Sequence, residues 1–177
     1  MSNLPSDQAL RAVISSYPEA DADSVQTGMT FLHTAAKIMR HYEDFFAHYG
    51  LSAGKFTVML ILQQSLEAAL TPSECAKHAG VSRGTISGLL NGLEREGLIF
   101  RKLHPEDGRM AKIQLSESGR KLLERLLPDY LKWTAILTSA LSEPEKKLFK
   151  RIMGKLHTRS AQFCQCRAIK LTSIQPS

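Results

Sequence analysis

The stretch between Val81 and Gly119 constrains the fold of this chain more than any other part of its sequence. It opens on Ser82, whose side chain can accept a hydrogen bond from a backbone N–H in the first turn of a helix. Gly97 is predicted to end this helix, because glycine readily adopts the left-handed conformation found at helix C-termini. Between them, apolar residues recur at three- and four-residue spacing and must face a core: Ile86, Leu89, Leu90 and Leu93. The pattern predicts an amphipathic helix with well-defined ends.

The opposite face of this predicted helix is polar and rich in glycine. Its polar side chains are Arg83, Ser87, Asn91 and Arg95, with Gly84, Gly88 and Gly92 between them. Each glycine weakens an exposed helix by about 0.8 to 1.0 kcal/mol relative to alanine. The glycines therefore either let the helix backbone approach phosphates closely, or are simply tolerated on a solvated surface.

A β-hairpin is predicted directly after this helix. Residues 98–103 and 110–115 have strand-like composition and flank a turn-rich tip at 104–109. Alternation places Lys112 on the solvent side with Gln114, and Ile113 on the core side with Leu115. A helix that can enter a groove, followed by a positively charged hairpin, is typical of a winged helix-turn-helix that binds duplex DNA.

The same stretch resembles the MarR-type family of dimeric winged-helix transcriptional regulators, most nearly its drug-efflux branch. From Val81 to Ile99 it fits the family pattern V-S-x-x-T-[VI]-[ST]-x-L-[VL]-[DN]-x-L-E-x-x-G-L-[IV]. The hairpin fits D-x-R-x5-L-[ST]-x2-G through Asp107, Arg109, Leu115, Ser116 and Gly119. The resemblance implies a mainly α fold with a small β-hairpin wing, in which the winged helix-turn-helix is flanked by N- and C-terminal dimerisation helices.

By position in these motifs, four residues are expected to line the major groove: Ser82, Arg83, Thr85 and Ser87. The resemblance places Arg109 in a minor groove, whose negative potential attracts arginine, with Asp107 holding its guanidinium. Further DNA contacts are expected from Ser73, Asn91, Arg95, Arg101 and Lys112. Many family members carry a basic residue where this chain has Gly92 or Gly108, so its affinity at physiological salt is expected to be modest.

Ser73 lies at the start of another predicted helix. Thr71 and Glu74 have the spacing of a capping box, and Pro72 suits the first helical position. This short helix would be the first of the helix-turn-helix. Ser73 in its first turn can contact a phosphate, because helix N-termini favour anions, or it is an ordinary cap-region serine.

The flanking helices suggest a partner subunit. A short helix from about Ser6 to Ser16 is followed by a long one from about Asp23 to Tyr49, whose apolar residues span an arc of about 200°. One core needs only about half of that arc, so the excess suggests burial against a second copy. We therefore expect four regions: 1–50 for dimerisation, 51–116 for DNA binding, 117–167 for dimerisation and 168–177 as a loose tail.

Two C-terminal helices are expected. The first runs from Ser116 to about Leu141 and is interrupted and kinked by Pro128. The second starts at Ser142, with Glu145 completing a capping box. Its inward face would consist of Leu148, Phe149, Ile152, Met153, Leu156 and Phe163.

The net charge of +6 is unevenly distributed. Residues 128–177 carry nine lysines and arginines against three acidic residues, which makes the C-terminal part the most basic. Four cations there share one side of a helix: Lys146, Lys147, Lys150 and Arg151. They could reach phosphates, although such a run is usually a solvated face.

Family members commonly bind small aromatic or phenolic anions between the dimer helices and the DNA-binding domain. The corresponding residues here would be Phe31, His33, Phe56, Met59, Tyr130 and Trp133. Aromatic walls with a few polar anchors suit such ligands, but aromatic and methionine residues at helical spacing also form ordinary cores.

Other functional classes are less well supported by the sequence. No run of about 18 apolar residues and no N-terminal signal pattern is present, so a cytoplasmic protein without a membrane segment is expected. An odd count of three cysteines argues against a disulfide framework. No nucleotide loop, H-E-x-x-H motif or serine elbow is found, and neither an enzyme nor a cofactor is expected.

Two cysteine sites and one interaction role remain as alternatives. Cys75, near a helix N-terminus, could have a lowered pKa and sense peroxide. His157, Cys164 and Cys166 are poorly spaced for a metal site, because positions 164 and 166 point about 160° apart on a helix. A winged helix used only for protein contacts is a further alternative.

The sequence as a whole thus predicts a DNA-binding transcriptional regulator. We expect a repressor that binds a pseudo-palindromic operator as a homodimer, with half-sites about one helical turn apart. Release by a small aromatic or phenolic ligand follows from the resemblance.

Overall fold

The computed structural model describes residue 9 and residues 13–65, 69–103 and 111–165. The chain forms two compact units, Met1–Leu126 and Leu127–Ser177. The predicted short helix at 6–16 lies largely outside the described residues. The hairpin tip at 104–109 and the C-terminal tail lie outside them entirely.

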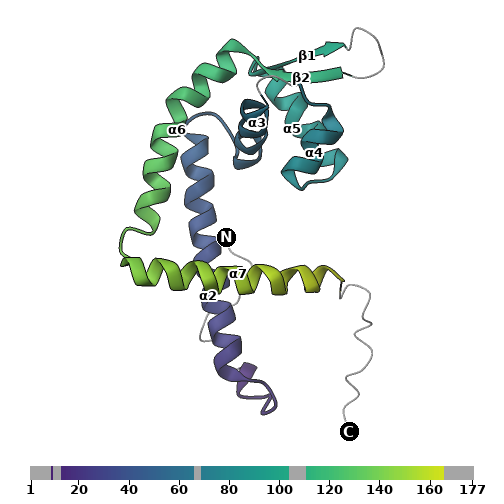
Figure 1. Ribbon diagram of the computed structural model, residues 1–177. Helices are drawn as coiled ribbons and strands as arrows, with labels where there is room; N and C mark the ends of the chain where they lie inside the picture. The colour runs from purple at the N-terminus through teal and green to yellow at the C-terminus, as the bar shows by residue number, and fades with distance from the viewer. Residues whose placement is uncertain (1–8, 10–12, 66–68, 104–110, 166–177) are drawn as a thin grey trace. The chain divides into compact units, whose positions relative to one another are not determined.

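The first unit contains most of the secondary structure (Figure 1). Its elements, in chain order, are α2 (Ala22–Ala47), α3 (Ala53–Gln64), α4 (Pro72–Ala79), α5 (Arg83–Arg95), β1 (Ile99–Leu103), β2 (Ala111–Leu115) and the first part of α6 (Glu117–Leu137). The second unit holds the rest of α6 and α7 (Glu143–Gln165). The predicted fold class, mainly helical with a small antiparallel hairpin, is confirmed.

Local capping sets the ends of α4 and α5, as the sequence predicts. Thr71 and Glu74 form the capping box of α4, with Pro72 at the first helical position. Ser82 caps α5 and accepts a hydrogen bond of 3.1 Å from the backbone N–H of Thr85. At the other end of α5, Gly97 has a φ of 70°, which any residue with a Cβ would adopt at a cost.

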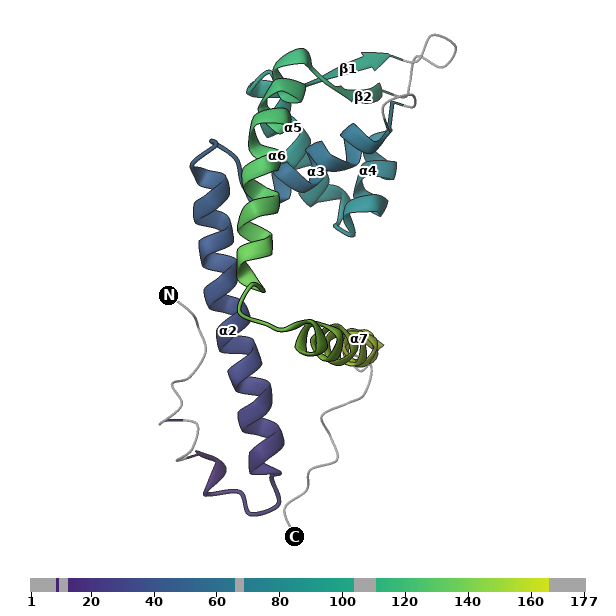
Figure 2. The same cartoon turned by 60° about the vertical axis from the view of Figure 1, so that its left-hand side comes forward.

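The α3, α4 and α5 helices pack together on one side of the hairpin (Figures 1 and 2). Their shared core contains side chains that are 2% exposed or less: Phe56, Val58, Met59, Cys75, Ile86, Leu90, Leu93 and Ile113. The apolar stripe predicted for α5 is therefore the face that it buries, with Leu89 half-buried at its edge. The opposite face of α5 is left to the solvent.

The two strands pair in one antiparallel ladder, with Ile99 opposite Leu115 and Arg101 opposite Ile113. Leu70 extends the sheet by one bridge, exchanging backbone hydrogen bonds of 2.7 and 3.2 Å with Ile113. Ile113 and Leu115 are buried, as alternation predicts, whereas Lys112 is half-buried at the surface. The hairpin is thus fixed to the helical core along one face.

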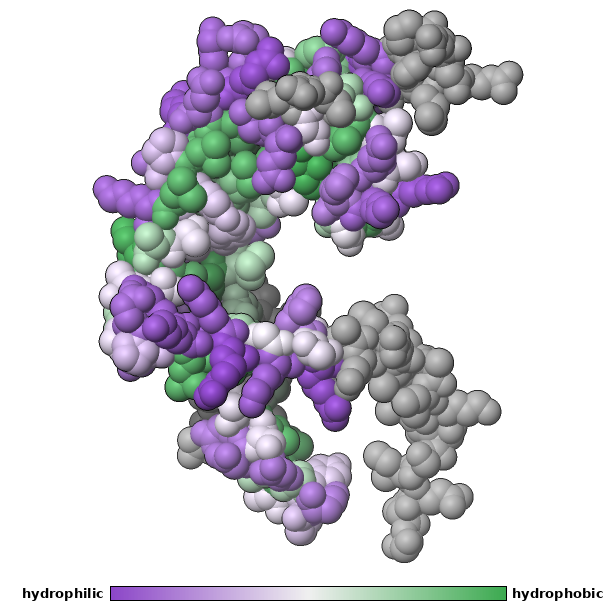
Figure 3. Space-filling model, in the orientation of Figure 1, coloured by the Kyte–Doolittle hydropathy of each residue, from purple (hydrophilic) through white to green (hydrophobic). Residues whose placement is uncertain are grey.

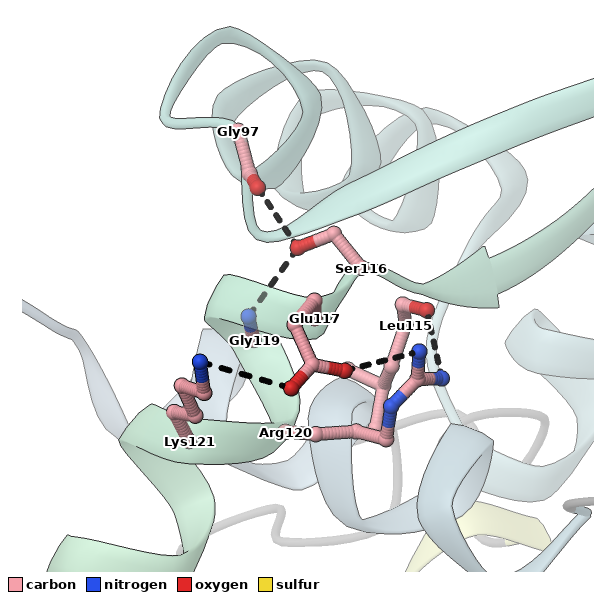
Figure 4. Close-up of polar contacts among 7 residues, drawn as sticks. All are labelled: Gly97, Leu115, Ser116, Glu117, Gly119, Arg120 and Lys121. Atoms are coloured by element: carbon pink, nitrogen blue, oxygen red, sulfur yellow. Dashed lines mark hydrogen bonds and ion pairs between the residues drawn. The ribbon is translucent and has the colours of Figure 1, made fainter.

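A tight joint connects α5, β1 and α6 (Figure 4). The Ser116 hydroxyl donates a hydrogen bond of 2.6 Å to the Gly97 carbonyl and accepts one of 3.0 Å from the Gly119 backbone N–H. The Ser116 backbone N–H also donates to the Leu98 carbonyl at 3.0 Å. A Cβ on Gly119 would lie 2.1 Å from the Leu98 carbonyl oxygen, closer than any carbon and oxygen can approach. The L-[ST]-x2-G pattern is therefore a packing requirement at this joint.

The predicted long helix is present as α6, but it is not interrupted at Pro128. It runs through this proline and ends at Leu137 rather than at about Leu141, and the kink at Pro128 stays a prediction. Proline lacks one backbone donor, and the loss of one hydrogen bond does not end this helix, whose turns before Pro128 are packed through Leu123 and Leu126. The start of α7 is as predicted, with Glu145 accepting hydrogen bonds from the Ser142 backbone and hydroxyl.

Several large apolar side chains of α2, α6 and α7 are exposed on the single chain. Those between 42% and 63% exposed are Phe31, Leu32, Met39, Leu131, Ile136, Leu137, Leu148, Phe149, Ile152 and Leu156. Of the predicted inward face of α7, Leu148, Phe149, Ile152 and Leu156 are exposed and Met153 is half-buried, while the side chain of Phe163 lies outside the described residues. The face of α7 turned to the viewer in Figure 3 is strongly hydrophilic, so α7 is amphipathic. Among the described residues, no helix is long and apolar enough to cross a membrane.

Substitution by alanine should have opposite effects on stability at Gly119, which lies in the joint, and at Gly88, which lies on the open face of α5. Gly119→Ala should lower the free energy of unfolding by about 1–3 kcal/mol or more, because the new methyl group collides with backbone. Gly88→Ala in α5 meets no atom within 4 Å and should raise stability by about 0.5–1 kcal/mol. Urea unfolding of both variants at one protein concentration measures this. Equal stability of the two variants would contradict the joint.

Candidate nucleic-acid interface

The outer face of α5 presents two arginines whose charge is not neutralised nearby. Arg83 and Arg95 are exposed, and neither forms an ion pair with a carboxylate in the part of the chain that the structure describes. Hydroxyl groups lie near Arg83 in the first turns of α5. The Ser87 hydroxyl donates to the Arg83 carbonyl at 2.8 Å, and Thr85 lies 2.9 Å from the Ser82 hydroxyl. This surface can attract an anion and donate or accept hydrogen bonds.

The three glycines of α5 have different surroundings. Gly88 faces open space, and Gly84 has only the Ser82 hydroxyl near it at 3.9 Å. Gly92, in contrast, is buried, and a Cβ there would lie 3.1 Å from the Cε atom of Lys55 in α3. The assignment of Gly92 to the exposed face is therefore wrong: its missing side chain makes room for Lys55. Close approach of the backbone to phosphates remains available at Gly84 and Gly88.

Lys55 crosses Gly92 to form an ion pair with Glu96, the residue that caps the C-terminal end of α5. Sequence reasoning missed this pair, because 41 positions separate its members and nothing in the local pattern links them. The pair lies at the surface, with 19% and 33% of the two side chains exposed. It links α3 to the C-terminal end of α5.

Arg101 and Asn91, predicted as separate DNA contacts, contact each other. The Arg101 guanidinium donates a hydrogen bond of 2.6 Å to the Asn91 side-chain oxygen, and its Nε lies 3.2 Å from a carboxylate oxygen of Glu94. Sequence reasoning had assigned Glu94 no role. The cluster connects strand β1 to the outer face of α5.

Ser73 is exposed in the first turn of α4, where the helix dipole favours an anion. Glu74 already occupies that turn. Hydrogen bonds from the backbone and hydroxyl of Thr71 hold the pKa of the Glu74 carboxyl below its usual value. An ionised carboxylate at this end competes with a phosphate, so Ser73 is a weaker candidate than the residues of α5.

The wing supplies one further described candidate. Lys112 on β2 is half-buried and close enough to Glu74 to help lower the pKa of that carboxyl. Asp107 and Arg109 of the tip lie outside the described residues.

Cys75 cannot serve as the predicted peroxide sensor. Its side chain is fully buried, and burial, reinforced by the negative charge of Glu74, raises the pKa of its thiol to about 11. The prediction of a lowered pKa is wrong, because loss of solvation outweighs the helix N-terminus. No group of three metal-ligating side chains occurs among the described residues; the side chain of Cys164 and all of Cys166 lie outside them.

The six residues predicted for a ligand pocket have different environments. Phe56 and Met59 are fully buried, and Phe56 stacks on Phe46 with ring centroids 4.5 Å apart. These two residues belong to the core of the first unit, and their part in a ligand pocket stays a prediction. On α2, Phe31 is exposed and His33 half-buried, whereas the half-buried Tyr130 and Trp133 belong to the second unit.

Comparisons with known proteins agree with this geometry. The family model described as "MarR family" matches residues 49–110. The HTH-type transcriptional repressor YetL of Bacillus subtilis is 32% identical over 163 residues, which cover 92% of this chain and 98% of YetL. The transcriptional repressor MprA of Escherichia coli is 26% identical, with 91% and 92% of the two chains covered.

Among solved structures, the fold is similar to that of MepR from S. aureus in a MepR–DNA complex. The TM-score is 0.64 at 24% sequence identity, and the match covers 75% of this chain and 94% of MepR. The structural match covers a larger part of the chain than residues 49–110, which the family model matches, so the similarity is not confined to the helix-turn-helix and hairpin.

Proposed function

The chain belongs to the MarR family of transcriptional regulators, and we propose that it represses transcription by binding duplex DNA through the outer face of α5 and the β1–β2 hairpin. The family and the relatives are regulators rather than enzymes, as the sequence predicts. The single observation that carries the DNA-binding proposal is the outer face of α5. It exposes Arg83 and Arg95, with the hydroxyl groups of Thr85 and Ser87 at positions between them, whereas the other face of α5 buries Ile86, Leu90 and Leu93.

The DNA contacts are assigned by position on this surface. We assign Ser82, Arg83, Thr85 and Ser87 to base edges and adjacent phosphates in the major groove, where hydroxyl and guanidinium groups can read or hold DNA. Arg95, Lys112 and, more weakly, Ser73 are assigned to phosphates. Arg109 at the wing tip is assigned to a minor groove with Asp107 as its support. A surface serving only protein contacts would not require two uncompensated arginines beside open glycines.

Removal of the Arg83 side chain tests this assignment. Arg83→Ala should weaken binding to the duplex upstream of the protein's own gene by about 1–3 kcal/mol and relax base preference. Lys37→Ala is the matched control, because it removes one exposed positive charge from α2 instead. Fluorescence anisotropy titrations at several salt concentrations measure both. If the two variants bind as the wild type does, the α5 assignment fails.

We further propose that the protein acts as a homodimer held by its N- and C-terminal helices, residues 1–50 and 117–167. The support is the set of large apolar side chains that α2, α6 and α7 expose on the single chain. On α7, Leu148, Phe149, Ile152 and Leu156 are all more than 40% exposed. Such a surface is expected to be covered by a partner. A two-fold dimer would bind a pseudo-palindromic operator.

Two aspartate substitutions on α7 test the dimer. Leu156→Asp places a charge on the apolar side and should produce a monomer that binds its operator weakly. Thr158→Asp, two residues on and therefore about 160° around the helix, should leave the dimer intact. Light scattering coupled to size-exclusion chromatography gives the mass of each. A dimeric Leu156→Asp protein, or a monomeric wild type, would count against this interface.

The last part of the proposal is release from DNA by a small aromatic or phenolic ligand. It rests on the family resemblance, with Phe31, His33, Tyr130 and Trp133 as the candidate contacts. A thermal-shift screen of aromatic acids and phenols, repeated with operator DNA, tests it. A releasing ligand should stabilise the protein and weaken DNA binding, since opposed binding requires a coupling free energy between two sites. A stabilising compound that leaves DNA affinity unchanged would argue against release.

A further inference from the structure

We propose that Arg101 is a positioning residue, which joins the wing to α5 and turns the Asn91 amide outward as a hydrogen-bond donor, rather than a direct phosphate contact. The inference rests on the proposed DNA-binding function and replaces one of the contacts expected from the sequence. Three independent features of the described residues support it.

The first feature is the face of the hairpin on which Arg101 lies. Arg101 is directly opposite Ile113, and residues opposite each other in a ladder project to the same face of the sheet. Ile113 is buried on the face that packs against the helical core, as are Ile99 and Leu115, which pair two positions along the ladder and so share that face. Arg101 therefore starts from the inner face of the wing and extends toward α5. The outer face carries Lys102 and Lys112 instead.

The second feature is the contact itself. Asn91 and Glu94 are three residues apart and adjacent on the surface of α5, and the guanidinium spans both of them. One group thus makes a hydrogen bond of 2.6 Å and an ion pair of 3.2 Å to the same helix. Two contacts from a planar guanidinium fix the direction of β1 relative to α5, which a lysine could not do in the same way.

The third feature is the amide orientation that this contact imposes. Arginine has donors only, so the Asn91 atom that faces it must be the carbonyl oxygen. The amide NH2 group of Asn91 then points away from Arg101. An amide held in this way offers its N–H groups to acceptors such as phosphate oxygens or the O6 and N7 atoms of guanine. Arg101 would thereby influence a DNA contact that it does not make itself.

The charges predict a distinctive salt dependence. Glu94 neutralises Arg101, so the arginine displaces no counterion from DNA. Loss of a phosphate contact lowers the slope of log affinity against log salt by about 0.9, whereas loss of a positioning residue leaves the slope unchanged. Loss of a residue with a purely structural role would also leave the slope unchanged. In that case, however, removing the Asn91 side chain would weaken DNA binding further, whereas after loss of a positioning residue it would not.

Arg101→Gln is the test, with Lys102→Gln as the matched loss of one charge from the outer face of the same strand. We expect Arg101→Gln to weaken binding to the upstream duplex about tenfold, the equivalent of one charge-assisted hydrogen bond, at an unchanged salt slope. A slope lowered by about 1, or an unchanged affinity, would overturn the proposal. Thermal unfolding checks that the variant is folded. We expect it to fold, because the Arg101 side chain is 33% exposed and is not part of the core.

Asn91→Ala, alone and combined with Arg101→Gln, completes the experiment. If the two residues act as one unit, the double variant binds DNA no more weakly than Arg101→Gln alone. Additive losses would overturn the positioning role. Should the wild-type protein bind no duplex at all, the proposed function fails instead, so the two failures are distinguishable.

Discussion

The arrangement of α5 and the hairpin in the first unit depends on the close approach of α6 to the end of α5. Gly119 lies so near the Leu98 carbonyl that no other residue fits, and Ser116 connects the Gly97 carbonyl to the first turn of α6. The helix that would enter the major groove, the first wing strand and the helix leading to the C-terminal unit thus share a few consecutive hydrogen bonds. We therefore expect a displacement of α6 to be transmitted to the end of α5, because Gly119 lies directly against the Leu98 carbonyl.

Charge at this surface is of two kinds, and the difference determines what the surface can do. Lys55 and Arg101 are each paired with a glutamate of α5 or its cap, and these pairs hold the helix in place. Arg83 and Arg95 form no ion pair with any described residue, so their charge remains available to an anion. A simple count of basic residues would treat all four alike. Exposed pairs contribute little stability, and their value here is geometric.

Local chemistry made much of the fold predictable. The serine cap, the left-handed Gly97 and the alternation at Ile113 each depend on a few consecutive residues, and all three are confirmed. The errors involve partners that are distant in sequence or effects of burial. Gly92 lies beneath Lys55 from another helix, and the pKa of Cys75 rises because the core excludes water. At Pro128 the helix is continuous where the local rule predicts an interruption.

The central claim, that paired copies of α5 and its wing bind duplex DNA, is tested most directly by hydroxyl-radical footprinting. The purified wild-type protein would be titrated onto the DNA upstream of its own gene at low and physiological salt. The structure and the family predict two protected patches on one face of the duplex, centred about one helical turn apart and weakened by salt. No protection at any protein concentration, or a single patch covering one half-site, would contradict the account.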